Sequence, residues 1–218
     1  MLKVNARARR ISLRLCASTR TVRLTVPPRA SRARAEAFLL AQQDWVARQA
    51  VLRLPPPIPF QPGVRIPLGD SELELCEGRG RTAIRDGSQL LVPGGEALFE
   101  GRVRRWLIAE ALMLLTAETR DVAGRLGKNV RKVSVGDFRS RWGSCGHDGR
   151  IAYSWRIILA PDHVRRAVVA HEVAHLAEHH HGESFWRLAT ELHGEPHREA
   201  RQWLAANGPR LHSYGFVG

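Results

Sequence analysis

Apolar and polar residues alternate in two short runs between residues 10 and 26. The apolar members are Ile11, Leu13, Leu15, Val22, Leu24 and Val26. Because successive side chains of a strand point to opposite faces, this pattern predicts a hairpin with one apolar face. Pro27 and Pro28 end it. Ser31 follows as a candidate N-cap, which predicts a helix that runs to about residue 54.

A proline-rich segment, LPPPIPFQPG at residues 54–63, interrupts the chain after this helix. Prolines stiffen the backbone and cannot continue a helix, so we interpret the segment as a linker. The sequence therefore predicts an N-terminal hairpin and helix at 1–54 and a second part at 64–218. One continuous domain is the alternative.

The second part begins with short apolar runs within residues 64–92 that predict four strands separated by glycine-rich turns. Helical spacing then extends from about residue 96 to 126 and ends at Gly127. The apolar side expected for this helix consists of Trp106, Ala109, Leu112, Met113, Thr116 and Val122.

Residues 130–138 and 150–159 predict two strands joined through the turn sequence at 146–149. Three helices are expected to follow. The first has one face formed by Val164, Val168, His171 and His175. The second spans about 183–193, and the last lies near Trp203. Strands and helices do not alternate regularly. The expected fold class is therefore α+β and not a doubly wound sheet.

The sequence HEVAH at residues 171–175 matches the pattern HExxH of zinc hydrolases. Residues four apart on a helix share one face about 6 Å apart, so His171 and His175 can bind one ion. Zinc binds imidazole nitrogen and, in catalytic sites, keeps one position for water. Glu172 follows the first histidine, where a carboxylate can accept a proton from that water.

A third ligand is expected further along the chain, where histidines and glutamates are crowded. If the helix continues toward Gly182, His179 lies about 12 Å along its axis from His171, too far for a shared zinc ion. Gly182 is a candidate helix stop, after which the chain can turn back. We therefore favour His181, with Glu191 as the alternative in a site of two histidines and one glutamate.

Net charge and composition add less specific information. Hydrophobic residues make up 44% of the chain, and no apolar run reaches the roughly 18 residues of a membrane span. The three cysteines form no disulfide pattern, which favours a reducing cytoplasm. The formal charge is +13, with 31 Arg against 3 Lys. That arginine bias suggests genomic base composition more than a dedicated surface, although the charge favours anionic partners such as nucleic acid.

Three sequence blocks together resemble the YgjP-like metallopeptidases, which are related more distantly to the SprT-like zinc proteases. These blocks are RWGSC at 141–145, RIAYSWRIILAP at 150–161 and HEVAHLAEHHHGESFW at 171–186. The resemblance implies a zincin-like domain with a central, mostly antiparallel sheet above the metal helix. It also implies His171, His175 and His181 as zinc ligands and Glu172 as general base. Ser154 stands where the family is expected to have Asn.

The functional expectation is a zinc-dependent peptidase that acts on a peptide or protein. Arg141 and Tyr153 are candidates for stabilising an oxyanion, while the segment 141–145 is expected to be a packed turn that supports the site. One alternative is a metal-dependent hydrolase of a nucleotide or other phosphorylated small molecule. Another is a basic nucleic-acid-associated protein in which the metal is structural. The sequence predicts no oligomeric state.

Overall fold

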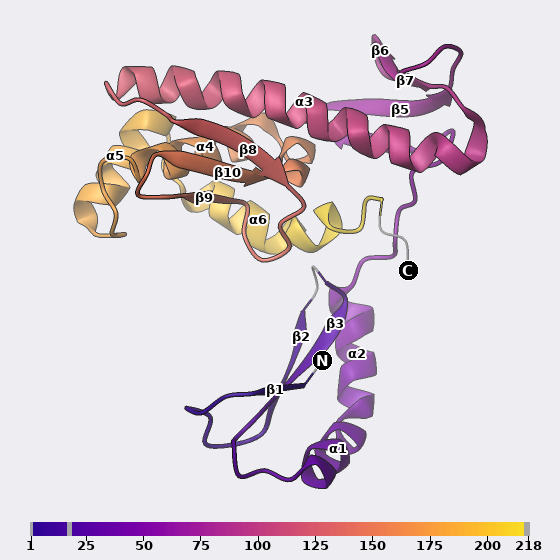
Figure 1. Ribbon diagram of the computed structural model, residues 1–218, viewed down its shortest axis with the longest axis vertical. Helices are drawn as coiled ribbons and strands as arrows, with labels where there is room; N and C mark the ends of the chain where they lie inside the picture. Colours follow the sequence, from indigo (N-terminus) through magenta and orange to yellow (C-terminus); the bar gives the residue numbers. More distant parts are fainter. Residues whose placement is uncertain (1, 17–18, 216–218) are drawn as a thin grey trace. The chain divides into compact units, whose positions relative to one another are not determined.

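In a computed structural model, which describes residues 2–16 and 19–215, the chain divides into two compact units (Figure 1). The first unit extends to Pro56 and the second begins at Pro57. This boundary lies inside the proline-rich segment 54–63. Side chains are described for all of these residues except 52 and 53.

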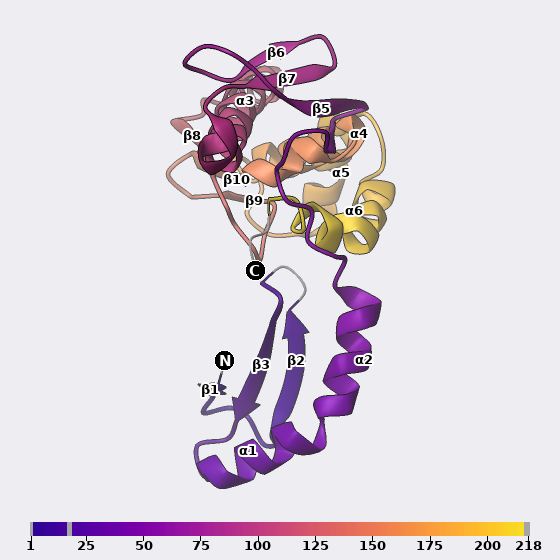
Figure 2. The same ribbon diagram turned by 90° about the vertical axis from the view of Figure 1, so that its right-hand side faces the viewer.

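The N-terminal unit combines a three-stranded sheet with two helices (Figure 2). Its elements are β1 (Leu2–Val4), β2 (Ser12–Cys16), β3 (Thr21–Val26), α1 (Arg32–Ala41) and α2 (Gln43–Arg53). The antiparallel pairing of β2 with β3 confirms the predicted hairpin, and the backbone N–H of Arg34 donates to the Ser31 side chain at 3.2 Å, as expected of a cap. The single predicted helix is instead two helices that meet at Gln42. The parallel pairing of β1 with β3 was not predicted.

The second unit begins with a four-stranded sheet and a long helix. The strands are β4 (Arg65–Leu68), β5 (Ser71–Glu77), β6 (Ile84–Asp86) and β7 (Gln89–Val92), in the order β4-β5-β7-β6, and the helix is α3 (Gly95–Arg125). The sequence predicted four strands and this helix. Gly127, which follows the helix, has the positive φ of 64° expected at a helix end.

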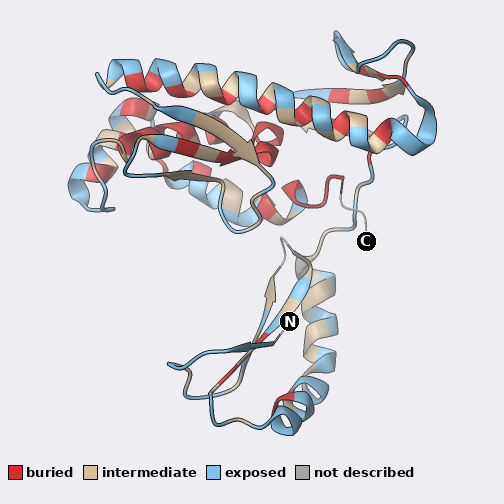
Figure 3. Cartoon of the chain, viewed as in Figure 1, coloured by how far each residue is buried: buried red, intermediate tan, exposed pale blue. Residues whose placement is uncertain are grey.

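The buried side of α3 differs from the expected one, although Val122 is buried as expected. Its buried positions, which recur along the helix in Figure 3, are Phe99, Val103, Leu107, Ala111, Leu115, Thr119, Val122 and Ala123. Leu112 and Met113, which were expected inside, are 43% and 62% exposed. Apolar residues occur all round this helix, so periodicity alone did not identify the face that the neighbouring elements cover.

A second sheet of three strands lies beside α3 and corrects the predicted hairpin. The strands β8 (Lys132–Gly136), β9 (Gly143–Cys145) and β10 (Arg150–Ser154) have the order β8-β10-β9. The turn at 146–149 joins β9 to β10, whereas β8 pairs with β10 in parallel. Residues 141–145 were expected to be a turn, but Gly143–Cys145 forms an edge strand. Both sheets of this unit therefore contain parallel and antiparallel pairs. The prediction of a mostly antiparallel sheet was wrong for the sheet β8-β10-β9, which has one pair of each kind.

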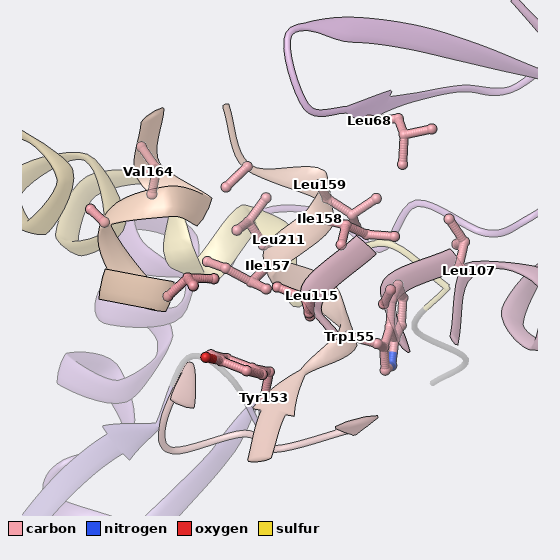
Figure 4. Packing of buried hydrophobic residues seen from close by; sticks show 14 of the residues in the cluster. Leu68, Leu107, Leu115, Tyr153, Trp155, Ile157, Ile158, Leu159, Val164 and Leu211 are labelled. Carbon is pink, nitrogen blue, oxygen red and sulfur yellow. The ribbon is translucent and has the colours of Figure 1, made fainter. Parts of the chain in front are cut away.

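The hydrophobic core surrounds a short 3-10 helix, η1 (Trp155–Leu159), where the sequence predicted a continued strand. All five of its residues are buried, and they pack against α3, α4 (Asp162–Ala174) and α6 (Arg198–Leu211) (Figure 4). The remaining helix, α5 (Glu183–His193), packs on α4 and follows the predicted bounds. The unit is thus α+β, with α4 enclosed by its neighbours. None of the helices in the described parts of the chain combines the length and the apolar character that a membrane span requires.

Buried arginines connect this core to its surroundings. Arg165 of α4 bonds Glu118 of α3 with 2.7 Å between Nη2 and Oε1, and its side chain is only 4% exposed. Arg156 of η1 is fully buried, donates from Nε to Asp137 at 2.7 Å, and also donates to the carbonyls of Leu211 and Tyr214. Because an unpaired buried charge is costly, these contacts fix the position of α4 and of the C-terminal segment.

Two α3 residues two positions apart test which side of the helix is buried. Leu115→Ala is expected to destabilise the protein by about 2–5 kcal/mol, because the side chain is fully buried and its removal leaves a cavity. Met113→Ala is the matched control and should change the free energy of unfolding by less than about 0.5 kcal/mol. Urea unfolding followed by tryptophan fluorescence measures both. Equal effects would contradict this orientation of α3.

Candidate metal site

The two histidines of HEVAH lie at the C-terminal end of α4. His171 is in the last turn, and His175 is the C-cap residue. The helix ends there instead of continuing toward Gly182, so the geometric premise used to choose a third ligand was wrong. Gly182 is the N-cap residue of α5 with φ −77°, and it does not adopt the left-handed conformation expected of a helix stop. Residues 176–182 connect the helices and bring His181 back toward α4.

His171, His175 and His181 converge on one point. Their ligand atoms all lie within 4.8 Å of one another, and the Nε2 atoms of His171 and His181 are 3.1 Å apart. A tetrahedral zinc ion with Zn–N bonds of roughly 2.0–2.1 Å places its ligand nitrogens about 3.4 Å apart, so this set of donors fits zinc. Nδ1 of His175 lies 2.9 Å from the carbonyl of Glu178, which leaves its Nε2 for the ion.

Phe185 of α5 packs against all three imidazole rings. The ring centroids are 4.9 Å from His171, 4.5 Å from His175 and 4.7 Å from His181, and Phe185 is fully buried. These contacts restrict the space open to the three imidazoles, a role that the sequence did not reveal.

Burial keeps two of the imidazoles, those of His171 and His175, in the neutral form that binds metal. The pKa of His171 is lowered to about 3, first by burial and then by the neighbouring His175 and His181. The pKa of His175 is lowered for the same leading reason. Since a metal ion binds neutral imidazole, no proton has to leave these two rings near neutral pH.

Glu172 points from α4 toward the edge strand β9 and is 6% exposed. Burial raises its pKa to about 7, while the charge of Arg141 and a hydrogen bond from the backbone N–H of Cys145 act in the opposite direction. A Cβ atom on Gly143 would lie 2.5 Å from Oε1 of Glu172 and 2.7 Å from its Cδ. Residue 143 must therefore lack a side chain for the carboxylate to occupy this position, a requirement that the sequence did not reveal.

A pocket of about 510 Å³ opens beside these groups. His171, Glu172 and His181 form one side of it. The rest is mostly apolar and consists of Trp142, Gly143, Ala167, Val168, Trp186, His197, Ala200, Arg201 and Leu204. Trp142 stacks on His212 with ring centroids 5.0 Å apart, which holds the indole in place.

Tyr153, Glu191 and Arg141 are the other candidates from the sequence, and Cys145 lies near Glu172 as well. Tyr153 is fully buried and its hydroxyl hydrogen bonds with Thr119 at 3.0 Å, so it is not available to stabilise an oxyanion. Glu191 is exposed on α5 and, in the part of the chain that the structure describes, does not belong to the three-histidine cluster. Burial raises the pKa of the Cys145 thiol to about 11, which disfavours the thiolate form that binds metal. Arg141 is exposed, close enough for its charge to act on Glu172.

An α+β unit with three converging histidines, a buried glutamate and an adjoining pocket defines the class of metal-dependent hydrolases. The family model that describes the YgjP-like metallopeptidase domain matches residues 9–207, and the chain belongs to this family. Membership implies a bound metal, and the three histidines form a group that could hold one. Neither the curated proteins nor the solved structures that were compared include a match.

Adjacent histidines test which side chains bind the metal. His181→Ala should lose most of the metal bound by the wild-type protein, because two remaining imidazoles leave the coordination incomplete. His180→Ala, a change at an exposed neighbour outside the cluster, should retain it. Elemental analysis after reconstitution and dialysis measures both. Full retention in His181→Ala would show that another residue is the third ligand.

Proposed function

We propose that the protein is a zinc-dependent metallopeptidase with a zincin-like catalytic core. His171, His175 and His181 would hold the zinc ion, and Glu172 would act as the general base. The observation that carries this proposal is the cluster of three imidazoles beside a pocket that two of them, His171 and His181, line together with the buried Glu172 carboxylate. The family model supports the same class of reaction.

Each residue has a distinct part in the proposed reaction. Bound zinc would polarise the scissile carbonyl and acidify a water molecule. Glu172 accepts a proton from that water and later delivers it to the leaving amine. The backbone N–H of Cys145 and the charge of Arg141 act on the Glu172 carboxylate and favour its ionised, proton-accepting form. Arg141 is also a candidate for stabilising the developing oxyanion, as another polar side chain could be.

The edge strand β9 offers a binding place for an extended substrate. In the order β8-β10-β9, β10 is the central strand, and among the described strands β9 pairs with β10 alone. The N–H of Cys145 is directed toward Glu172, so one edge of β9 faces the proposed catalytic group. An extended peptide that pairs with such an edge would bring its backbone carbonyl close to the metal site.

The composition of the pocket favours a peptide over a phosphorylated small molecule. Trp142, Trp186 and Leu204 suit a bulky apolar side chain of the substrate. The residues that line the pocket include one arginine, Arg201. Its guanidinium group lies over the Trp186 ring, 5.0 Å from the ring centroid. A site for several phosphates would be expected to present more cations to its ligand.

Glu172→Gln should keep zinc but lose about 100- to 10,000-fold in turnover, because the amide cannot accept a proton. The assay is cleavage of an unstructured protein or peptide library by the zinc-loaded enzyme, with zinc content measured in parallel. Glu191→Gln, at the exposed glutamate of α5, is the matched control and should retain activity. Unchanged turnover in Glu172→Gln would exclude Glu172 as the base, and hydrolysis of nucleotides without peptide cleavage would contradict the peptidase proposal.

Gly143→Ala should reduce turnover by about 100-fold while zinc is retained. The added methyl group would overlap the Glu172 carboxylate and displace it by on the order of 1 Å. Gly124→Ala is the control, since a Cβ atom there meets nothing within 4 Å. Wild-type turnover in Gly143→Ala would mean that the position of Glu172 is not critical for the reaction.

A further inference from the structure

The positive charge of the chain is concentrated in the N-terminal unit. Residues 1–56 contain 12 arginines and lysines against two acidic residues, which gives a net charge of +10. Residues 57–218 contain 22 against 19 and have a net charge of +3. Genomic base composition acts on both parts of one gene alike, so it can explain arginine in place of lysine but not this difference in net charge. The earlier interpretation of the charge as a compositional effect is therefore insufficient.

One face of the N-terminal sheet is basic and not covered by the helices of the unit. Leu24 and Val26 of β3 face the other side, where Ala35 and Phe38 of α1 pack on them. Arg14 of β2 lies directly opposite Arg23 of β3, and both are exposed. Like charges in this position repel each other, so the pairing is unfavourable unless an anion lies across it.

A hollow at the end of the same sheet adds four more arginines. It measures about 930 Å³ and is formed by the chain entering β2, the chain leaving β3 and the first turns of α1. Arg9, Arg10, Arg29 and Arg34 line it, all four are exposed, and no acidic residue is among its lining. Glu36, one of the two acidic residues of the unit, is already paired with Arg32 at 2.7 Å.

We propose that the N-terminal unit binds the phosphate backbone of nucleic acids through these six arginines. A guanidinium group matches phosphate geometry and can bind it with two hydrogen bonds. Arg10 lies two residues before β2 and Arg14 lies within it, so the two are separated by about 13 Å if the chain between them is extended. A basic surface of this length exceeds one phosphate group and fits a polymer of regularly spaced charges. This inference does not depend on the proposed peptidase activity.

The unit offers little for reading base sequence. No aromatic residue belongs to the basic face, and the one that lines the hollow, Phe38, packs on the small core of the unit. Stacking on aromatic rings is the usual means of holding unpaired bases. Binding should therefore depend on phosphates, with little preference for sequence and a strong dependence on salt.

Fluorescence anisotropy of labelled DNA with the full-length protein tests the proposal. We expect Arg9, Arg10, Arg29 and Arg34 changed together to Gln to weaken binding by about tenfold or more near 100 mM salt. The slope of log K against log salt should fall by roughly 3 on single-stranded DNA. The control variant loses the same amount of charge in the second unit. In it, four exposed arginines are changed together to Gln, namely Arg65, Arg79, Arg81 and Arg85.

Thermal unfolding of both variants establishes that they are folded. Weakened binding in the first variant, with a loss of less than about threefold in the control, supports the proposal. Equal losses would show that net charge alone is responsible and would overturn it. Absence of binding by the wild-type protein at low salt would overturn it as well. So would binding to vesicles that contain phosphatidylserine without binding to DNA, because the anionic partner would then be a lipid surface.

Discussion

The contact between β9 and the end of α4 is the constraint on which the site depends. Glu172 can lie beside the metal ligands and remain buried only because Gly143 lacks a side chain at the point of contact. The backbone N–H of Cys145, two residues further along β9, then partners the carboxylate. A wider separation would expose the carboxylate to water, and any side chain at residue 143 would force it away. The position of one short edge strand thus determines the environment of the proposed base.

That contact persists because α4 is held by elements on several sides. Its buried residues include Val164, Val169 and Val173, and Arg165 connects it to α3 through Glu118. Ser154 and Trp155, at the junction between β10 and η1, are also fully buried. The Ser154 hydroxyl has no hydrogen-bond partner among the described residues, at the position where the family resemblance led us to expect Asn. The core around the site therefore depends on apolar packing and two buried arginines more than on a polar network.

Local patterns predicted the parts of the structure that depend on local geometry. The spacing of HEVAH placed two histidines on one helix face, and Ser31 and the alternation in 10–26 predicted a cap and a hairpin. The parallel pairing of β8 with β10 could not be predicted in this way, because it joins segments that are separated by β9. His181 was favoured on the assumption of a longer helix, and the structure brings it to the cluster by another path. The roles of Gly143 and Phe185 became visible only from contacts between elements.

The histidine cluster has the arrangement that a metal ion would need before one binds. Phe185 packs against all three rings, and burial favours the neutral form of His171 and His175. Most of the conformational entropy of these side chains is therefore lost when the protein folds, and little more has to be lost when the metal binds. His181 is the exception, since it is exposed and belongs to the segment between α4 and α5. Coordination of His181 would connect that segment to α4, so the bound metal should also stabilise the wall of the pocket that α5 contributes through Trp186.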